Sequence, residues 1–165
     1  YPLESITRVT WGATRHSING IPTGTTYAIS FGDDRSTSTV ETRRSSVYEE
    51  VIDRLWKTTG MIIITKLLKD FKNGQGLTFN NATIWDDGVS LSKSGGWFSS
   101  DEKKKFSWGE IQIYSSNGNF VIESLKDKKF VTAIAYQGVY NVHFLEQLIR
   151  MMFKDVNIKK LSDLL

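Results

Sequence analysis

Seven short apolar stretches between residues 77 and 135, followed by one amphipathic segment, most constrain the fold of this chain. Apolar residues recur at every second position or form short runs, a pattern typical of β-strands. The predicted strands are 77–80, 82–86, 89–92, 105–111, 112–115, 119–125 and 129–135. Asp87-Gly88 and Asn117-Gly118 both favour tight hairpin turns. The sequence therefore predicts a mostly antiparallel β domain.

A helix is predicted directly after the last of these strands. Asn141 is a good N-cap residue, and the positions that follow place apolar side chains on one helical face. These side chains are Val142, Leu145, Leu148, Ile149, Met152 and Phe153. The remaining residues, 156–165, form an amphipathic tail with no assigned structure.

The first 75 residues predict strands and one long helix. We expect strands at 3–11 and within 25–42, separated by a long hairpin tip at 14–24 that contains two glycines and a proline. A capping box of Ser46 and Glu49 opens a predicted helix over 46–73. Gly60 and the β-branched run 62–65 weaken its continuity, since those four residues alone would indicate a buried strand.

The two parts of the chain show an internal similarity. Residues 1–6 match the apolar positions of 106–111 at an offset of 105, and residues 27–34 match 120–127 at an offset of 93. Strand, turn, strand and helix follow in the same order, which favours a repeat over a chance alignment of short apolar patterns. We therefore expect the first copy to be a back half whose first ~30 residues are absent from the chain or supplied by another molecule.

Seven strands followed by a helix resemble a pleckstrin-homology (PH) domain, in which two sheets form a barrel closed at one end by the helix. Residues 14–27, 77–79, 87–89 and 106–111 are more specifically similar to an uncharacterised, largely bacterial family with PH-like domains. The resemblance implies a complete PH-like barrel at 76–155, preceded by the C-terminal half of a second unit at 1–75. The loop 94–104 is longer and richer in Gly, Ser and Lys than this family leads us to expect.

Composition argues against several classes of function. The chain has 21 basic and 18 acidic residues, and its two parts, 1–75 and 76–165, carry 10 against 8 and 11 against 10. A nucleic-acid binder normally has a concentrated basic stripe, so we expect no nucleic-acid partner. No cysteine is present, which excludes a thiol nucleophile and thiolate metal ligands. The expected location is the cytoplasm, with association at a membrane as the alternative.

No set of residues predicts catalysis. His16 and His143 have no carboxylate at metal-ligand spacing, so we expect neither a metal nor a cofactor, and a hydrogen-bonded, partly buried role for His143. The pairs Asp33-Asp34 and Asp86-Asp87 fall at predicted turns, which aspartate favours, although two carboxylates also serve hydrolases. We expect a chain that is not an enzyme.

One segment stands out as a candidate contact site. Residues 93–105 combine two aromatic residues with lysines, an arrangement that suits an anionic membrane surface. The candidate contact residues are Lys93, Trp97, Phe98, Lys103, Lys104 and Lys105. Asp101 and Glu102 oppose these lysines, and a lysine run is commonly a solvated face. The leading hypothesis is an interaction module for a protein or peptide, with binding to anionic membrane lipid through this loop as the alternative.

Overall fold

The computed structural model describes residues 2–93 and 102–165. The fold is mixed α and β, with mostly antiparallel strands in three open sheets and one long helix. The chain divides into two compact units, the first made of Tyr1–Ile64 and Tyr136–Phe144 and the second of Thr65–Ala135 and Leu145–Leu165. In the ranges that the structure describes, no helix is both long and apolar enough to cross a bilayer.

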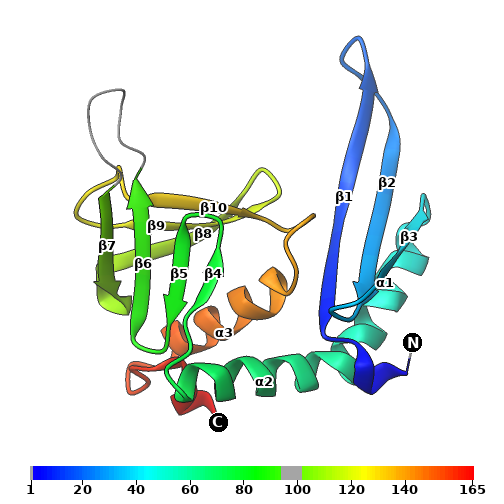
Figure 1. Cartoon of the computed structure of the whole chain (residues 1–165). Helices are drawn as coiled ribbons and strands as arrows, with labels where there is room; N and C mark the ends of the chain where they lie inside the picture. The colour runs from blue at the N-terminus through cyan, green and yellow to red at the C-terminus, as the bar shows by residue number, and fades with distance from the viewer. Residues whose placement is uncertain (1, 94–101) are drawn as a thin grey trace. The chain divides into compact units, whose positions relative to one another are not determined.

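The first unit contains a three-stranded antiparallel sheet in the order β1-β2-β3. Its strands are β1 (Arg8–Ile18), β2 (Ile21–Gly32) and β3 (Thr37–Thr42). β3 pairs only with the second half of β2, so the far ends of β1 and β2 form a two-stranded ribbon (Figure 1). The Asp33 carboxylate accepts the Arg35 and Ser36 amides at 2.8 and 2.9 Å, which makes the turn between β2 and β3 as predicted.

Two predictions for this region are wrong. Leu3–Ser5 is a short 3-10 helix, η1, where a strand was expected. The predicted hairpin tip at 14–24 is mostly strand, because Asn19 and Gly20 alone make the turn, with φ of 51° and 81°. Two positive φ angles are what a two-residue type I′ turn requires, and its twist matches that of the flanking strands.

The core of the first unit is an aromatic cluster. Trp11 on β1 makes edge-to-face contacts with Trp56 and Phe144, at ring-centre distances of 6.0 and 5.5 Å. His143 is stacked between Trp11 at 4.1 Å and Tyr136 at 4.4 Å. Its Nε2 lies 2.9 Å from the Trp11 carbonyl oxygen, so the predicted structural role of His143 is confirmed.

The long helix predicted at 46–73 is confirmed. It consists of α1 (Ser45–Leu55), a π-helical turn η2 (Trp56–Gly60) and α2 (Met61–Lys72), which follow one another without a break. A Cβ on Gly60 would lie 3.1 Å from the Phe144 ring and 3.2 Å from the Trp56 ring. Glycine therefore leaves room for these two rings at the π turn. Packing explains why a residue of low helix propensity occupies this position.

Asn141 lies directly before α3, at the position predicted for the helix N-cap, and its side chain binds β1. Its φ is 65°, and its side chain holds the edge of β1, with Nδ2 donating to the Thr7 carbonyl at 2.8 Å and Oδ1 accepting the Val9 amide at 3.0 Å. The Asn141 amide also donates to the Val9 carbonyl at 2.8 Å. Asparagine tolerates the left-handed conformation, and its side chain supplies both a donor and an acceptor, so it meets both requirements of this position.

The second unit contains the seven strands predicted after residue 76. Four form a sheet in the order β4-β5-β6-β7 and three a sheet in the order β8-β9-β10 (Figure 1). Their bounds are β4 (Leu77–Phe79), β5 (Ala82–Trp85), β6 (Gly88–Lys93), β7 (Glu102–Ser107), β8 (Ile111–Ser116), β9 (Asn119–Ser124) and β10 (Val131–Ala135). Each sheet buries one apolar face, with Ile84, Val89 and Leu91 in the first and Phe120, Ile122 and Ile134 in the second.

The predicted closed barrel is not confirmed, because the seven strands pair as two open sheets. Side chains join these sheets where a barrel would need backbone pairing. The Asn81 side-chain amide donates to the Ser92 carbonyl at 2.8 Å, and the Thr132 hydroxyl donates to the side-chain oxygen of Asn81. The Asn80 amide donates to the Ala133 carbonyl at 3.1 Å. The β4–β5 turn is thereby tied to β10.

A short 3-10 helix corrects the predicted strand 105–111. The strand ends at Ser107, and η3 (Trp108–Glu110) precedes β8. The Glu110 carboxylate accepts hydrogen bonds from the Ser107 amide at 3.1 Å and the Ser107 hydroxyl at 2.9 Å. This capping box satisfies amide groups that a continuing strand would have paired, so the chain turns from one sheet into the other here.

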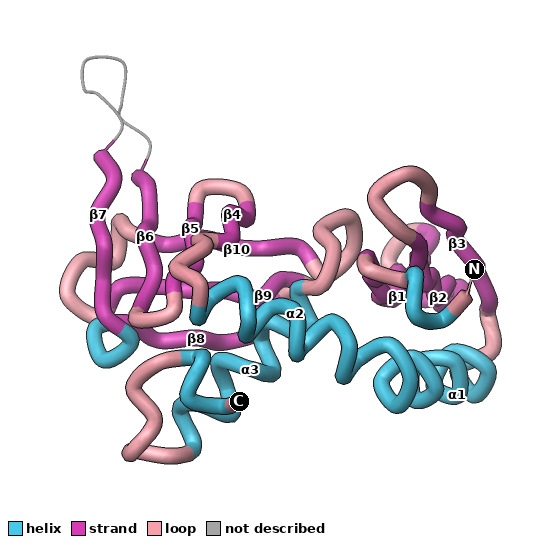
Figure 2. Tube along the Cα trace, turned by 60° about the horizontal axis from the view of Figure 1, so that its bottom comes forward, coloured by secondary structure: helices cyan, strands magenta, loops and turns pink. Residues whose placement is uncertain are grey.

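Helix α3 (Val142–Lys154) confirms the predicted C-terminal helix. Leu145, Leu148, Ile149 and Met152 are buried, as expected for its apolar face, whereas Phe153 is 40% exposed. Figure 2 shows α3 beside β8, and the Ser115 hydroxyl donates to Glu146 at 2.9 Å. The tail that followed the predicted helix contains a further 3-10 helix, η4 (Leu161–Leu164).

We predict that Asn141→Ala lowers the free energy of unfolding by about 2–3 kcal/mol, because two hydrogen bonds to β1 are lost and alanine resists a positive φ. Asn141→Gly keeps the conformation and should cost about half as much. Urea denaturation measures both, and hydrogen exchange at the Val9 amide reports the local effect. Equal stability of Asn141→Ala and the unaltered chain would contradict this role.

Candidate functional site

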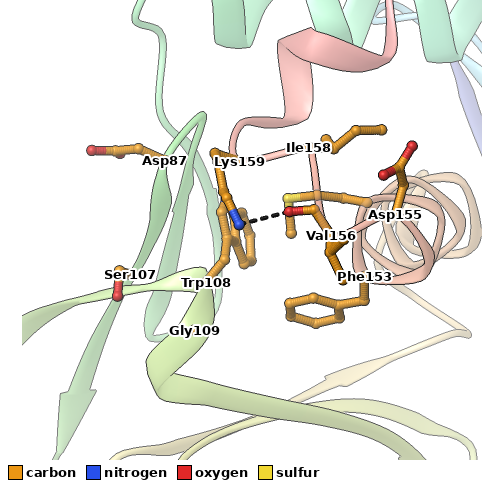
Figure 3. A pocket seen from close by; sticks show the side chains of 10 residues that line it. Asp87, Ser107, Trp108, Gly109, Phe153, Asp155, Val156, Ile158 and Lys159 are labelled. Carbon is orange, nitrogen blue, oxygen red and sulfur yellow. Dashed lines mark hydrogen bonds between the residues drawn. The ribbon is translucent and has the colours of Figure 1, made fainter.

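A pocket of about 470 Å³ lies in the second unit, at the point where β7 passes into η3. It is lined from four places in the chain: the β5–β6 turn, the β7–η3 junction, the end of α3 and the segment after α3. Figure 3 shows Trp108 between Asp87 and Ser107 on one side and Phe153 and Val156 on the other. The site is therefore built from segments that are far apart in the sequence.

The wall of the pocket is largely apolar. Trp108 is 5% exposed and faces Phe153 edge to face, with 6.3 Å between the ring centres. Its indole Nε1 donates to the Asp86 carbonyl at 2.9 Å, so the polar edge of the ring is satisfied inside the protein. Met152 and Ile158 add aliphatic surface. An indole, a phenyl ring and a thioether together suit an apolar or aromatic group of a ligand.

Charged groups lie at the rim. Lys159 Nζ donates to the Val156 carbonyl at 2.7 Å, beside Trp108 in Figure 3. Asp87 forms an ion pair of 2.7 Å with Lys105, and this hydrogen-bonded lysine lowers the pKa of the Asp87 carboxyl. Asp155 also lines the pocket, and its Oδ1 accepts the backbone and side-chain amides of Asn157 at 2.9 and 3.0 Å. The rim therefore carries one lysine bound to a neutral carbonyl and two carboxylates, of which Asp87 is matched by a cation.

Glu110 fixes the turn that carries Trp108. Besides its two bonds from Ser107, it accepts one from Lys126 Nζ at 2.8 Å. Lys126 foremost, followed by the Ser107 amide and hydroxyl, lowers the pKa of Glu110 from 4.5 to about 2. Three donors on one carboxylate stabilise its ionised form, which explains the direction of the change.

Asp86 attaches the C-terminal segment to the site. Its carboxylate accepts the Ser162 amide and the Ser162 hydroxyl, each at 2.8 Å, and its carbonyl accepts the Leu161 amide at 3.0 Å. Leu161 is fully buried. One aspartate thus positions both η4 and, through the same carbonyl, the Trp108 indole.

The predicted contact lysines lie on β6 and β7, and most have partners. Lys93 pairs with Glu102 at 2.6 Å, which raises the pKa of Lys93, and lies 5.1 Å above the Phe130 ring. Lys103 donates to the Thr83 hydroxyl at 3.2 Å, and Lys104 lies 5.4 Å from the Phe106 ring centre. Lys105 pairs with Asp87. Trp97 and Phe98 lie outside the described residues, so lipid or partner contact through this set stays a prediction.

The remaining residues considered for chemistry are spread across the chain. His16 is hydrogen-bonded to Thr26 on the exposed ribbon, at 2.8 Å. Asp33 makes a turn, as described above, and hydrogen bonds from the Ser36 and Arg35 amides lower its pKa. Among residues 2–93 and 102–165, no three His, Cys, Asp or Glu side chains form a group able to hold a metal ion.

Sequence reasoning missed the pocket. The alternation of 105–111 predicts a strand that includes Trp108, and the sequence predicts no structure for 156–165. Two signals were present: Ser107 and Glu110 have capping-box spacing, and Leu161 to Leu165 has apolar residues around Ser162 and Asp163. Neither signal reveals that Asp86 binds this segment, because residues 86 and 162 are 76 positions apart.

No family model, no curated protein and no solved structure matches the chain.

We predict that Asp86→Ala destabilises the C-terminal segment. Two hydrogen bonds to a carboxylate are lost, which should lower the free energy of unfolding by about 2–3 kcal/mol. Hydrogen exchange at the Leu161 and Ser162 amides should become faster. The neighbouring Asp87→Ala is the matched control, because an exposed ion pair contributes only about 0–1 kcal/mol. Unchanged exchange at both amides in Asp86→Ala would contradict the attachment.

We predict that Glu110 titrates with a midpoint near pH 2 in the folded chain. Its pKa is lowered by folding, so its contribution to stability is complete above about pH 4.5 and is lost as the pH falls toward 2. NMR titration of the side-chain carboxyl measures the midpoint, and Lys126→Ala should raise it. A Glu110 midpoint near 4.5 that Lys126→Ala does not change would show that Ser107 and Lys126 do not bind this carboxylate.

Proposed function

We propose that the chain is a non-catalytic interaction module, that its second unit is a PH-like domain, and that a protein or peptide partner binds in the Trp108 pocket. The single observation that carries the proposal is the Trp108–Phe153 pair, which lines a pocket of about 470 Å³. Phe153 is 40% exposed there although it belongs to an otherwise buried helix face. Exposed aromatic side chains in a preformed pocket are typical anchors for a partner.

The order of elements supports the PH-like assignment. Four antiparallel strands, then three, then a helix follow in chain order from β4 to α3. The Phe106 ring on β7 lies 5.3 Å from the ring of Phe130, the residue directly before β10. Hydrogen bonds of Asn80 with Ala133 and of Asn81 with Thr132 add a second junction. These contacts favour a barrel-like sandwich of two sheets.

The first unit supports the proposed repeat. It runs from η1 through β1, an Asn19-Gly20 turn, β2 and β3 to a helix. The second unit repeats this order from η3 through β8, an Asn117-Gly118 turn, β9 and β10 to α3. The offset of 105 places Leu3–Ser5 on Trp108–Glu110, both of them 3-10 helices. We interpret the first unit as the back half of a second PH-like unit.

The polar residues near the pocket favour binding over catalysis. Asp86 holds Ser162, Glu110 holds Ser107 and Lys126, and Asp87 is paired with Lys105. Each of these carboxylates has a structural partner, whereas a nucleophile needs an adjacent base that is available to it. Binding of an anionic lipid surface is the second candidate, favoured by Lys103 and Lys104, whose described contacts are a hydroxyl and an aromatic ring.

We predict that Phe153→Ala weakens binding of a selected peptide by about tenfold or more, because a partly exposed aromatic anchor is removed. Peptides would be selected from a random library on the unaltered chain, and their affinities measured by calorimetry. Their binding should shift the Trp108 indole resonance. Met151→Ala is the matched control, since Met151 is 41% exposed on the same helix and does not line the pocket.

Peptides whose affinity is the same for Phe153→Ala and the unaltered chain would overturn the assignment of the pocket. Binding to phosphatidylserine vesicles that displaces no peptide, together with an unchanged Trp108 resonance, would favour the lipid candidate instead.

A further inference from the structure

β7 ends at the pocket and has an open edge. It is the last strand of its sheet, and no other strand pairs with its outer edge among the residues that the structure describes (Figure 2). Ser107, its final residue, lines the pocket, and Trp108 follows directly. An open edge presents backbone N–H and C=O groups that can pair with an added strand. The edge and the pocket thus form one continuous surface.

The charge of this edge selects its partner. Lys103, Lys104 and Lys105 are consecutive and exposed on β7. Lys103 and Lys104 have no carboxylate partner within the described residues, because Glu102 on the same strand is matched by Lys93 and Asp87 by Lys105. Pairing with a second copy of β7 would place lysines beside lysines, which is unfavourable. An acidic strand would place carboxylates there.

The pocket at the end of β7 is the second feature that would select a partner. A strand added to β7 and running toward Ser107 would bring a side chain to the Trp108–Phe153 wall. Lys159 at the rim is bound to a neutral carbonyl, so its charge remains available to an acidic group beside that side chain. Backbone pairing along the edge gives affinity in this mode of binding, and a pocket for one side chain gives specificity.

We propose that the site binds an extended acidic peptide segment, which adds to β7 as a strand and places one large apolar side chain in the Trp108 pocket. The inference rests on the proposed function, because the same pocket takes the apolar group. It adds the chemical class of the partner and the way its backbone binds.

The test uses a defined probe: an acetylated and amidated ten-residue peptide in which glutamates and threonines alternate around one central phenylalanine. Binding is followed by NMR of the full chain at low salt, with the β7 amides and the Trp108 indole as reporters. N-methylation of alternate peptide bonds removes backbone donors and keeps every side chain, so it should weaken binding by about tenfold or more. Replacing the glutamates by lysines should abolish binding.

Variants of the chain test the charge of the edge. Lys103→Glu with Lys104→Glu should weaken binding of the probe by about tenfold at low salt and less at high salt. Arg43→Glu with Arg44→Glu is the control, because it changes the net charge equally on the exposed segment before α1. This control should leave the affinity unchanged.

The outcomes separate the two proposals. If the probe shifts Trp108 and needs Phe153, while N-methylation and the Lys103/Lys104 reversal have no effect, strand addition is wrong and the pocket assignment stands. If the probe shifts the β7 amides but leaves the Trp108 indole resonance unchanged, and if Phe153→Ala does not change the affinity of the probe, the pocket assignment fails. If the probe does not bind and phosphatidylserine vesicles do so in a Lys103/Lys104-dependent way, both peptide proposals are overturned.

Discussion

Each sheet of the second unit has one apolar face, and neither sheet is stable in water unless that face is covered. Phe106 on β7 contacts Phe130, the residue directly before β10, and α3 adds the buried side chains of Leu145, Leu148 and Ile149. Burying such a set of side chains contributes about 1.5–3 kcal/mol for each. This core holds β7, η3 and the end of α3 in place, and the pocket exists because these three segments end near one another.

The pocket combines an apolar wall with polar groups that serve the fold. Asp86, Glu110 and Asp87 each bind neighbouring parts of the protein, and together they orient Trp108 and the segment after α3. Because this network is satisfied internally, the proposed ligand would meet rings and aliphatic side chains without breaking these hydrogen bonds. The open edge of β7 then adds backbone groups and lysines to the same surface. The proposed recognition of a peptide by shape, backbone pairing and charge rests on this combination.

Much of the secondary structure could be predicted, and the errors have local physical causes. The strand predicted at 105–111 lies at Glu102–Ser107, because the apolar alternation continues through Trp108 while the Ser107–Glu110 capping box ends the strand. The hairpin tip at 14–24 was predicted as loop because of its glycines and proline, yet Asn19-Gly20 alone makes the turn. Helix propensity is low at Gly60, and packing of Trp56 and Phe144 at that glycine overrides it. The site was missed because Asp86 and Ser162 meet only in three dimensions.

The sequence by itself determined the seven strands after residue 76, the two Asn-Gly turns, the amphipathic α3 and the order of elements shared by the two units. These depend on periodicity and on turn residues, which act between near neighbours in the chain. Tertiary structure decided that the strands pair as open sheets, that Asn141 binds β1, and that Trp108, Phe153 and Lys159 line one pocket. Contacts between distant residues require the folded core, because only its packing brings those side chains within hydrogen-bonding or van der Waals distance.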